Sequence, residues 1–162
     1  MRILFIEDEV NLSALGADQL RRLGHQVWEA PNLQVARAIL DDPTINIQLI
    51  IADHRLPDGF GIDFIIEEAK EESLPIPAVI VSGCLTPADI AILNRLGIPY
   101  FRKPVLYSHV IRKFRQTPLM SKDSDPAAGG TGEEEDEGIG DEAVEAGRAS
   151  WFRGIVDRFR RP

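Results

Sequence analysis

Charged residues follow three apolar runs of strand length in this chain, and their types suit phosphoryl chemistry. The charged motifs are Glu7-Asp8, Asp53 and Lys103-Pro104, and they follow residues 3–6, 49–52 and 100–101. In an open parallel sheet, ligands bind beyond the carboxyl ends of the strands, so these motifs are expected to converge on one crevice. Three carboxylates and one ammonium in a single crevice suit Mg²⁺ and a phosphoryl group.

Asp53 is the candidate nucleophile, because a carboxylate can attack phosphorus and form an acyl phosphate. Crowded carboxylates repel a phosphodonor and raise one another's pKa, and a hard divalent cation with oxygen ligands answers both problems. We therefore assign Asp8 and Asp53 as direct Mg²⁺ ligands and Glu7 as a ligand through water. The backbone carbonyl of Arg55 is expected to complete the set.

Two further side chains are expected to hold the phosphoryl oxygens. Lys103 would neutralise them from the side opposite the metal, and Ser82, just past the fourth apolar run, would donate a hydrogen bond. Alone, each signal has an ordinary explanation: an acidic pair after a strand, a Ser-Gly turn, a solvated surface lysine. The interpretation depends on all the signals occurring at strand ends of one fold.

Strand and helix patterns alternate five times up to about residue 116. Strands are predicted over residues 2–6, 26–30, 45–52, 78–81 and 99–102. The intervening helices are predicted through Leu12, Leu15, Leu20 and Leu23, over 32–40, from Ile62 onward, over 86–96 and over 106–114. Such alternation is typical of an α/β fold, a doubly wound parallel sheet with helices on both faces.

Composition limits the location and the partners. The 162 residues include no run approaching the roughly 20 apolar residues of a membrane span, no signal-peptide pattern, and a lone Cys84, so a cytoplasmic location is expected. Residues 1–122 carry 13 basic and 15 acidic groups, which excludes the basic stripe of a nucleic-acid binder. His25, His54 and His109 show no metal-ligand spacing and are expected at the surface or in loops.

The motifs resemble the receiver domain of bacterial response regulators in two-component systems. The resemblance rests on residues 3–9, 50–61, 79–83 and 101–104, which read ILFIEDE, IIADHRLPDGFG, VIVSG and FRKP. It implies a flavodoxin-like five-stranded sheet of order 2-1-3-4-5, with Asp53 phosphorylated by a histidine kinase or a histidine phosphotransfer protein. Pro57 and Gly61 match the family's loop after the phosphoacceptor, and Tyr100 matches its switch aromatic.

The departures from the family pattern are small. Glu7 replaces the commoner Asp, and Ser82 replaces the commoner Thr while keeping the hydroxyl. Arg55 lies at a variable position near the path of attacking water, so it is expected to alter the phosphoryl lifetime in a direction that the sequence does not give. On phosphorylation, Ser82 is expected to move toward the phosphoryl group and Tyr100 to rotate inward, reshaping the surface of the fourth helix, fifth strand and fifth helix.

Beyond the receiver domain, predicted over residues 1–117, the composition changes. Residues 118–147 read as an acidic disordered linker, and residues 148–162 as a short basic amphipathic helix. Its apolar face would hold Trp151, Phe152, Ile155, Val156 and Phe159. Three uses stay open: a partner groove, a membrane surface, or packing on its own receiver.

The leading hypothesis is a stand-alone receiver that signals through protein–protein contacts. No DNA contact is expected, since the remaining residues are too few for a helix-turn-helix module and the acidic stretch would be repelled by DNA. The chain would catalyse only its own phosphorylation and dephosphorylation, and both a phosphorelay intermediate and a phosphorylation-dependent dimer fit.

The alternative is a phosphorylation-independent adaptor acting through the C-terminal helix. A phosphohydrolase is disfavoured, because Arg55 occupies the place of its second acid. The kinase, the downstream target, the phosphoryl lifetime and the oligomeric state are not encoded in these motifs.

Overall fold

Five parallel strands form the central sheet in the computed structural model, which describes residues 1–71 and 76–116. The strands are β1 (Arg2–Ile6), β2 (Gln26–Ala30), β3 (Leu49–Ala52), β6 (Ala78–Ser82) and β7 (Tyr100–Arg102). The helices are α1 (Val10–Arg22), α2 (Leu33–Leu40), α3 (Gly61–Glu71), α4 (Pro87–Leu96) and α5 (Tyr107–Gln116). A small hairpin, β4 (Arg55–Leu56) and β5 (Gly59–Phe60), follows β3.

The strand order is β2-β1-β3-β6-β7, and every pairing within this sheet is parallel. Because β6 and β7 are the fourth and fifth strands of the sheet in chain order, this confirms the predicted order and the flavodoxin-like fold. Parallel pairing puts the carboxyl ends of all five strands at one edge. The charged motifs that follow β1, β3 and β7 therefore start from the same edge.

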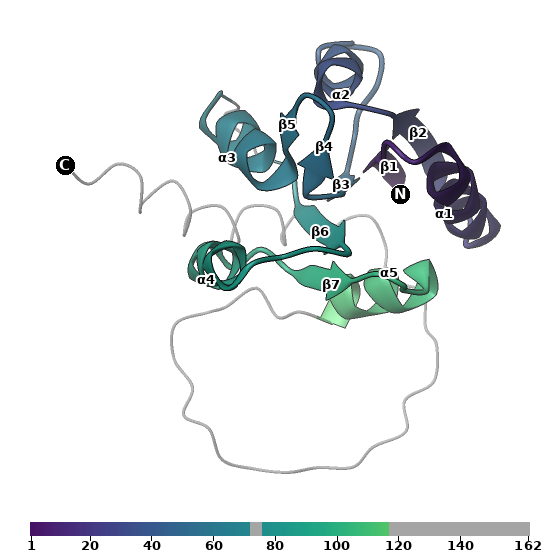
Figure 1. Cartoon of the computed structure of the whole chain (residues 1–162). Helices are drawn as coiled ribbons and strands as arrows, with labels where there is room; N and C mark the ends of the chain where they lie inside the picture. The colour runs from purple at the N-terminus through teal and green to yellow at the C-terminus, as the bar shows by residue number, and fades with distance from the viewer. Residues whose placement is uncertain (72–75, 117–162) are drawn as a thin grey trace.

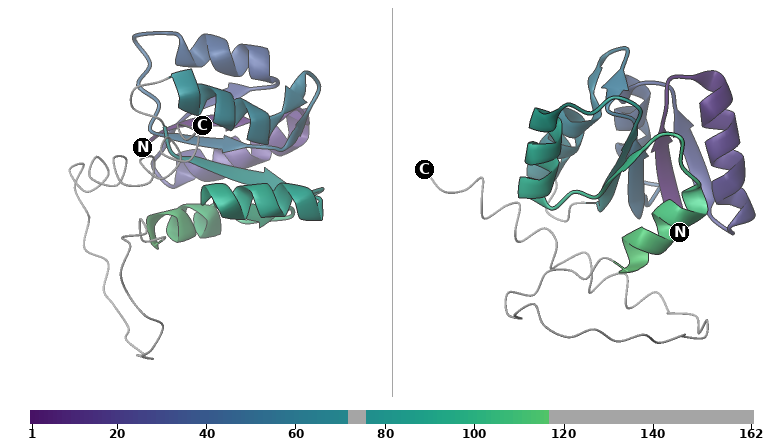
Figure 2. Two further views of the ribbon diagram at one scale, coloured as in Figure 1. Left: turned by 90° about the vertical axis from the view of Figure 1, so that its left-hand side faces the viewer. Right: turned by 60° about the horizontal axis from the view of Figure 1, so that its bottom comes forward.

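Helices cover both faces of the sheet (Figures 1 and 2). Helices α1 and α5 lie on one side, where Ala17, Leu20, Val110 and Ile111 pack against Ile3, Phe5, Ile51 and Val79 of the strands. Helices α2, α3 and α4 lie on the other, where Ala36, Phe64 and Leu93 pack against Leu4, Ile6, Ile50 and Ile80. Since successive strand side chains point to opposite faces, each strand contributes to both cores. The central strands can therefore be apolar throughout.

Side-chain caps and a left-handed glycine define the ends of two helices. The Asn32 side chain accepts a hydrogen bond from the Val35 N–H at 2.9 Å and caps α2. Thr86 and Asp89 form a reciprocal capping box at the start of α4, where Pro87 is the first residue. That helix ends at Gly97, whose φ of +72° lies in the left-handed region that glycine tolerates best.

Helix α1 confirms the prediction of a helix but not of its buried side. Among the leucines that mark it in the sequence, Leu20 is fully buried, whereas Leu12, Leu15 and Leu23 are 37%, 58% and 44% exposed. The side that packs on the sheet carries the small residues Ser13, Gly16 and Ala17 instead.

The close approach of α1 to the sheet explains this side. A Cβ atom at Gly16 would come within 2.7 Å of the Phe5 ring and 2.8 Å of the Tyr107 ring. The two rings meet edge to face with centroids 5.1 Å apart, so they fill the space that a leucine side chain would need. Small residues therefore face the core, and the leucines are directed away from it.

Several boundaries differ from the sequence prediction, most of them by one or two residues. β3 begins at Leu49 instead of residue 45, because Ile45 closes a turn by donating its N–H to the Asp42 carbonyl at 3.0 Å. α5 begins at Tyr107, and Leu106 before it is 67% exposed. The acidic linker and the amphipathic segment, residues 118–147 and 148–162, lie outside the described residues.

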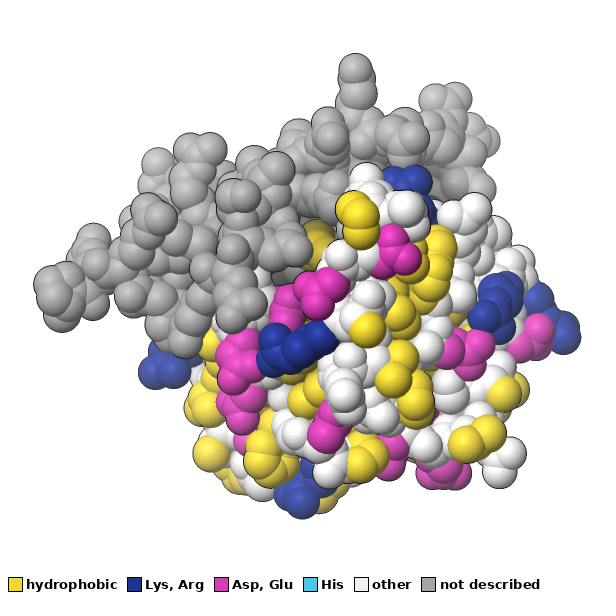
Figure 3. Space-filling view, turned by 90° about the horizontal axis from the view of Figure 1, so that it is seen from above, with side chains coloured by type: hydrophobic (Ala, Val, Ile, Leu, Met, Phe, Trp, Pro, Cys, Tyr) yellow, Lys and Arg dark blue, Asp and Glu magenta, His cyan; other side chains and the backbone are white. Residues whose placement is uncertain are grey.

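The surface of the folded part has mixed character. On the face seen from above Figure 1, acidic and basic side chains are interspersed with apolar ones (Figure 3). Within residues 1–71 and 76–116, no helix combines the length and the apolar character needed to cross a bilayer.

Candidate functional site

The strand ends bring Glu7, Asp53 and Lys103 into direct contact. The ammonium of Lys103 lies 2.5 Å from Oδ2 of Asp53 and also pairs with Oε2 of Glu7. Oxygen atoms of Glu7, Asp8 and Asp53 all lie within 4.8 Å of one another. The convergence expected from the sequence therefore occurs, with 96 positions separating Glu7 from Lys103.

Extensions of the sheet's hydrogen bonding fix the backbone at each of these residues. Glu7 donates its N–H to the Ala30 carbonyl at 3.0 Å, and Asp53 donates to the Ile6 carbonyl at 2.9 Å. Lys103 donates to the Ser82 carbonyl at 3.1 Å, one step past the end of β7. The functional side chains thus start from rigid strand ends, which limits how far they can drift apart.

One cation shared by two carboxylates sets the electrostatics of the site. Burial raises the pKa of Glu7, and the charge of Asp53 adds to this, while Lys103 only partly offsets it. Burial also acts to raise the pKa of Asp53, but Lys103 and Ser82 outweigh it, so that pKa falls below its ordinary value. The pKa of Lys103 is raised despite burial, because both carboxylates favour its charged form.

The oxygen cluster fits a hard divalent cation. All its donors are carboxylate oxygens, and Asp8 is exposed whereas Glu7 is 3% exposed and the Asp53 side chain 12%. Oxygen ligands in a partly open site are what Mg²⁺ prefers, since it keeps several of its own waters. Residues Glu7, Asp8 and Asp53 are the ones that could hold it.

The other residues assigned from the sequence lie at different distances from this centre. Ser82 is buried at the end of β6 and contributes to the lowered pKa of Asp53. Arg55 is exposed, and its N–H donates to Oδ1 of Asp53 at 3.3 Å. Tyr100 is half-buried on β7 and packs against the core beneath α4. Their roles in metal binding, phosphoryl contact and switching stay predictions.

Gly61 keeps the loop after Asp53 tight. Its N–H donates to the His54 carbonyl at 2.8 Å, which closes the loop around the β4–β5 hairpin. A Cβ atom at Gly61 would lie 2.1 Å from the carbonyl oxygen of Asp53, well inside any permitted contact. The loop can therefore return to Asp53 at this point only with glycine.

His54 is a residue that the sequence reasoning missed. It lies in the loop after β3, as expected, yet it is only 5% exposed, and its ring stacks on Phe60 with centroids 5.2 Å apart. Its Nε2 lies 3.5 Å from Oδ2 of Asp89, and its Nδ1 has no hydrogen-bond partner among the described residues. His54 thus links the loop after Asp53 to the first turn of α4. Its position beside the candidate nucleophile was the available sequence signal.

His25 lies in the turn between α1 and β2, as expected, but it too is buried. It is 7% exposed, and its Nδ1 lies 3.2 Å from the ammonium of Met1. Burial, that ammonium and Arg115 lower the pKa of His25 to about 4. His25 is therefore neutral at physiological pH.

Comparison with curated protein sequences finds relatives of this chain. No protein-family model matches the chain. It is 28% identical over 134 residues to the transcriptional regulatory protein DpiA of Escherichia coli, a match that covers 79% of this chain and 58% of DpiA. The chain spans about half the length of the curated relatives it matches.

Solved structures share the fold over the described part of the chain. The non-phosphorylated receiver domain of HemR from Leptospira biflexa is 25% identical, with a TM-score of 0.62 over 76% of this chain and 98% of that domain. The response regulator TrrA from Thermotoga maritima, solved in complex with Mg²⁺-BeF, is 21% identical, with a TM-score of 0.60 over 71% of this chain and 96% of TrrA. The strand order, the acidic cluster with its lysine and these likenesses together identify the described part of this chain as a receiver domain of the response regulator type.

Proposed function

We propose that this receiver domain is a phosphoacceptor switch, with Asp53 accepting a phosphoryl group from a histidine kinase or a histidine phosphotransfer protein. The observation that carries the proposal is the contact of Lys103 with both Asp53 and Glu7, beside the exposed Asp8. An ion-paired carboxylate with an adjacent cation site suits acyl phosphate formation better than it suits a purely structural role.

Mg²⁺ is the metal we propose for the site. Asp8 and Asp53 would bind it directly, Glu7 through water, and the carbonyl of Arg55 would complete the protein ligands. The ion would offset the negative charge that Asp53 and the incoming phosphoryl group bring together. The Mg²⁺-BeF complex of TrrA, a protein of the same fold, supports this choice.

In the transfer step, a carboxylate oxygen of Asp53 attacks phosphorus, and the bond from phosphorus to the donor's imidazole nitrogen breaks. The nitrogen keeps that electron pair, and Asp53 becomes an acyl phosphate. The Lys103 ammonium would exchange part of its contact with the carboxylates for contact with the phosphoryl oxygens. The Ser82 hydroxyl would donate a hydrogen bond to one of those oxygens. Attack of water later releases phosphate, and the exposed Arg55 lies close enough to influence that step.

The signal would leave through a change of surface. As Ser82 is drawn to the phosphoryl group, Tyr100 would rotate inward, and the surface of α4, β7 and α5 would change shape. Moving such an equilibrium from mostly off to mostly on takes about 5.5 kcal/mol of differential stabilisation. Several charge-assisted hydrogen bonds in a sheltered site are of the size required.

We propose protein–protein contact as the output, in a cytoplasmic protein. DpiA is by name a transcriptional regulatory protein, so a test must distinguish DNA binding from protein–protein contact. The near-neutral charge of residues 1–122 argues against DNA contact by the receiver itself. The apolar set Trp151, Phe152, Ile155, Val156 and Phe159 lies outside the described residues and offers a second contact, with a partner groove or a membrane surface.

Intact-mass spectrometry tests the proposal most directly. The protein is incubated with acetyl phosphate and Mg²⁺, beside Asp53→Asn and a sample with chelator. A single Mg²⁺-dependent phosphoryl adduct that Asp53→Asn lacks would support the switch. If no condition produces an adduct, the adaptor that works without phosphorylation through the C-terminal segment becomes the better description.

A further inference from the structure

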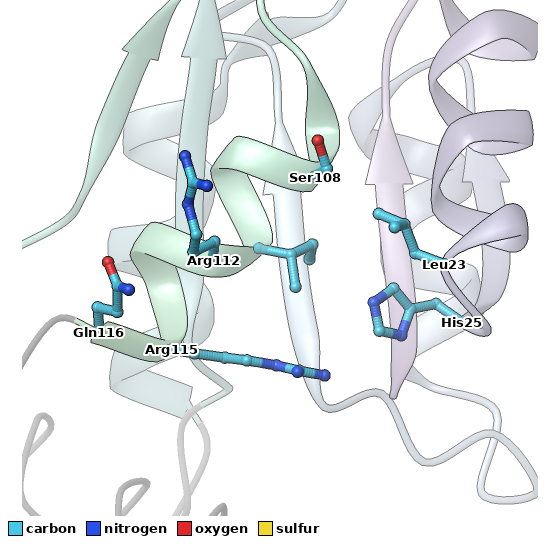
Figure 4. A pocket seen from close by; sticks show the side chains of 7 residues that line it. Leu23, His25, Ser108, Arg112, Arg115 and Gln116 are labelled. Atoms are coloured by element: carbon cyan, nitrogen blue, oxygen red, sulfur yellow. The ribbon is translucent and has the colours of Figure 1, made fainter. Parts of the chain in front are cut away.

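A cleft of about 310 Å³ lies between α5 and the turn that joins α1 to β2, apart from the phosphoacceptor site (Figure 4). Leu23 and His25 line it from the turn, and Arg112, Arg115 and Gln116 line it from α5. The figure shows the Arg115 side chain reaching from α5 across the cleft toward His25. The cleft is therefore bounded on one side by two guanidinium groups.

The charge around this cleft is positive. Helix α5 carries Arg112, Lys113 and Arg115 and no carboxylate, and residues 23–26 are without Asp or Glu. Within the described ranges, neither Arg112 nor Arg115 has a carboxylate oxygen within 4.0 Å. Burial and the Met1 ammonium lower the pKa of His25, and Arg115 adds to this effect.

Helix stabilisation explains these charges only in part. Cations in the last turn of a helix interact favourably with its dipole, and Lys113 and Arg115 are placed for this. Arg112 lies a turn earlier, where its guanidinium contacts Nδ1 of His109 at 3.0 Å. The Arg115 side chain extends across the cleft toward His25.

The chain itself supplies an acidic ligand next to this cleft. It leaves α5 at Gln116, which lines the cleft, and residues 123–147 contain ten carboxylates and no Lys or Arg. Five of these are consecutive, Glu133 to Glu137. Sixteen residues separate Gln116 from Glu133 and can span up to about 50 Å, which is ample for a return to the cleft.

We propose that the cleft between α5 and the α1–β2 turn is a binding site for the acidic run Glu133–Glu137 of the same chain. Tethering through so few residues gives an effective concentration of the order of millimolar, so a modest charge-assisted affinity is enough. The contact covers an end of α5, and it is sensitive to ionic strength because its groups are exposed to solvent.

Paramagnetic broadening in the full-length protein tests this site. The exposed Cys84 is replaced by alanine, and a nitroxide is attached through Gly138→Cys, directly after the acidic run. We expect the amide signals of Leu23, His25 and residues 112–116 to broaden most. Glu→Gln replacement at positions 133, 134, 135 and 137 together with Asp136→Asn should abolish the broadening. About 1 M NaCl, at which the Debye length is about 3 Å, should do the same.

Matched variants decide whether the cleft is responsible. Arg112→Gln with Arg115→Gln should remove the broadening, and Arg112→Lys with Arg115→Lys should keep it. Arg95→Gln with Arg102→Gln, which remove two exposed charges elsewhere, should also keep it. The proposal fails if the glutamine pair at 112 and 115 leaves the broadening unchanged, or if the broadening centres on another element. A mixture of ¹⁵N-enriched protein that carries no nitroxide with unenriched protein that carries it tests for contact between two copies. The proposal also fails if the same amide signals broaden in this mixture.

Discussion

The imidazole of His54 and the carboxylate of Asp89 lie 3.5 Å apart and connect the loop after Asp53 to the first turn of α4. His54 directly follows Asp53, and the same Asp89 oxygen accepts hydrogen bonds at 2.8 Å from the backbone and the hydroxyl of Thr86. A displacement of the loop on phosphorylation would therefore reach α4 through a single side chain. This connection joins the candidate site to the helix whose surface is proposed to change.

Replacement of His54 by leucine should uncouple the loop from α4 at little cost in stability. The Nδ1 atom of His54 is buried without a hydrogen-bond partner in the described residues, so an apolar side chain of similar size should change the free energy of unfolding by no more than about 1 kcal/mol. His54→Ala should cost about 2–3 kcal/mol, because it leaves a cavity beside Phe60. Denaturant unfolding of both variants measures the difference.

His54→Leu should also change the NMR signals of α4. Amide signals of residues 86–90 are expected to shift in His54→Leu and to stay in place in His109→Leu, which alters a histidine on α5. Unchanged signals at the start of α4 would show that the contact with Asp89 carries no coupling.

The capping box of α4 should give a pH-dependent contribution to stability. Hydrogen bonds from Thr86 hold the pKa of Asp89 below its ordinary value of 3.8, so the folded state favours the ionised carboxylate. This stabilisation is fully present above pH 3.8 and is lost as the pH falls through the lower folded value. Thr86→Ala should destabilise the protein by about 1 kcal/mol at pH 7. The difference in free energy of unfolding between wild type and Asp89→Asn should become smaller in acid, as measured by unfolding at a series of pH values. A difference that does not depend on pH would contradict this prediction.

Gly61→Ala should distort the loop that follows Asp53. The added Cβ would lie 2.1 Å from the Asp53 carbonyl oxygen, so the backbone must move, at a cost of about 1–3 kcal/mol. Because the displaced backbone carries Asp53, phosphorylation by acetyl phosphate should also slow. Gly83→Ala is the matched control, since a Cβ there meets nothing within 4 Å. Equal rates and stabilities for the two variants would refute the steric argument.

Mg²⁺ should stabilise the folded protein through the acidic cluster. A ligand that binds only the folded state at tenfold its Kd raises the free energy of unfolding by about 1.4 kcal/mol. Asp8→Asn should abolish this gain, because it removes the exposed carboxylate of the cluster. Asp63→Asn, an exposed acid on α3, should retain it. Thermal unfolding with and without Mg²⁺ gives the comparison, and an equal gain in both variants would place the ion elsewhere.

The sequence by itself determined the alternation of strands and helices and the location of the site, whereas the order of the strands came from the family resemblance. Apolar runs marked the strands, and in a parallel sheet the residues after successive strands must meet at one edge. The convergence of Glu7, Asp53 and Lys103 therefore followed from local patterns and topology. Capping of α4 by Thr86 is likewise local, because it involves residues within one helical turn.

Contacts between segments remote in the chain were decided by the tertiary structure. Asp58 accepts hydrogen bonds from the N–H groups of Leu33 and Gln34 and so caps α2 from the β4–β5 hairpin. The small-residue side of α1 faces the core because Phe5 and Tyr107 fill the space beside Gly16. The burial of His54 likewise depends on α4 and Phe60. Side-chain patterns report local propensity, whereas the space and the partners available to each side chain are set only when distant elements pack together.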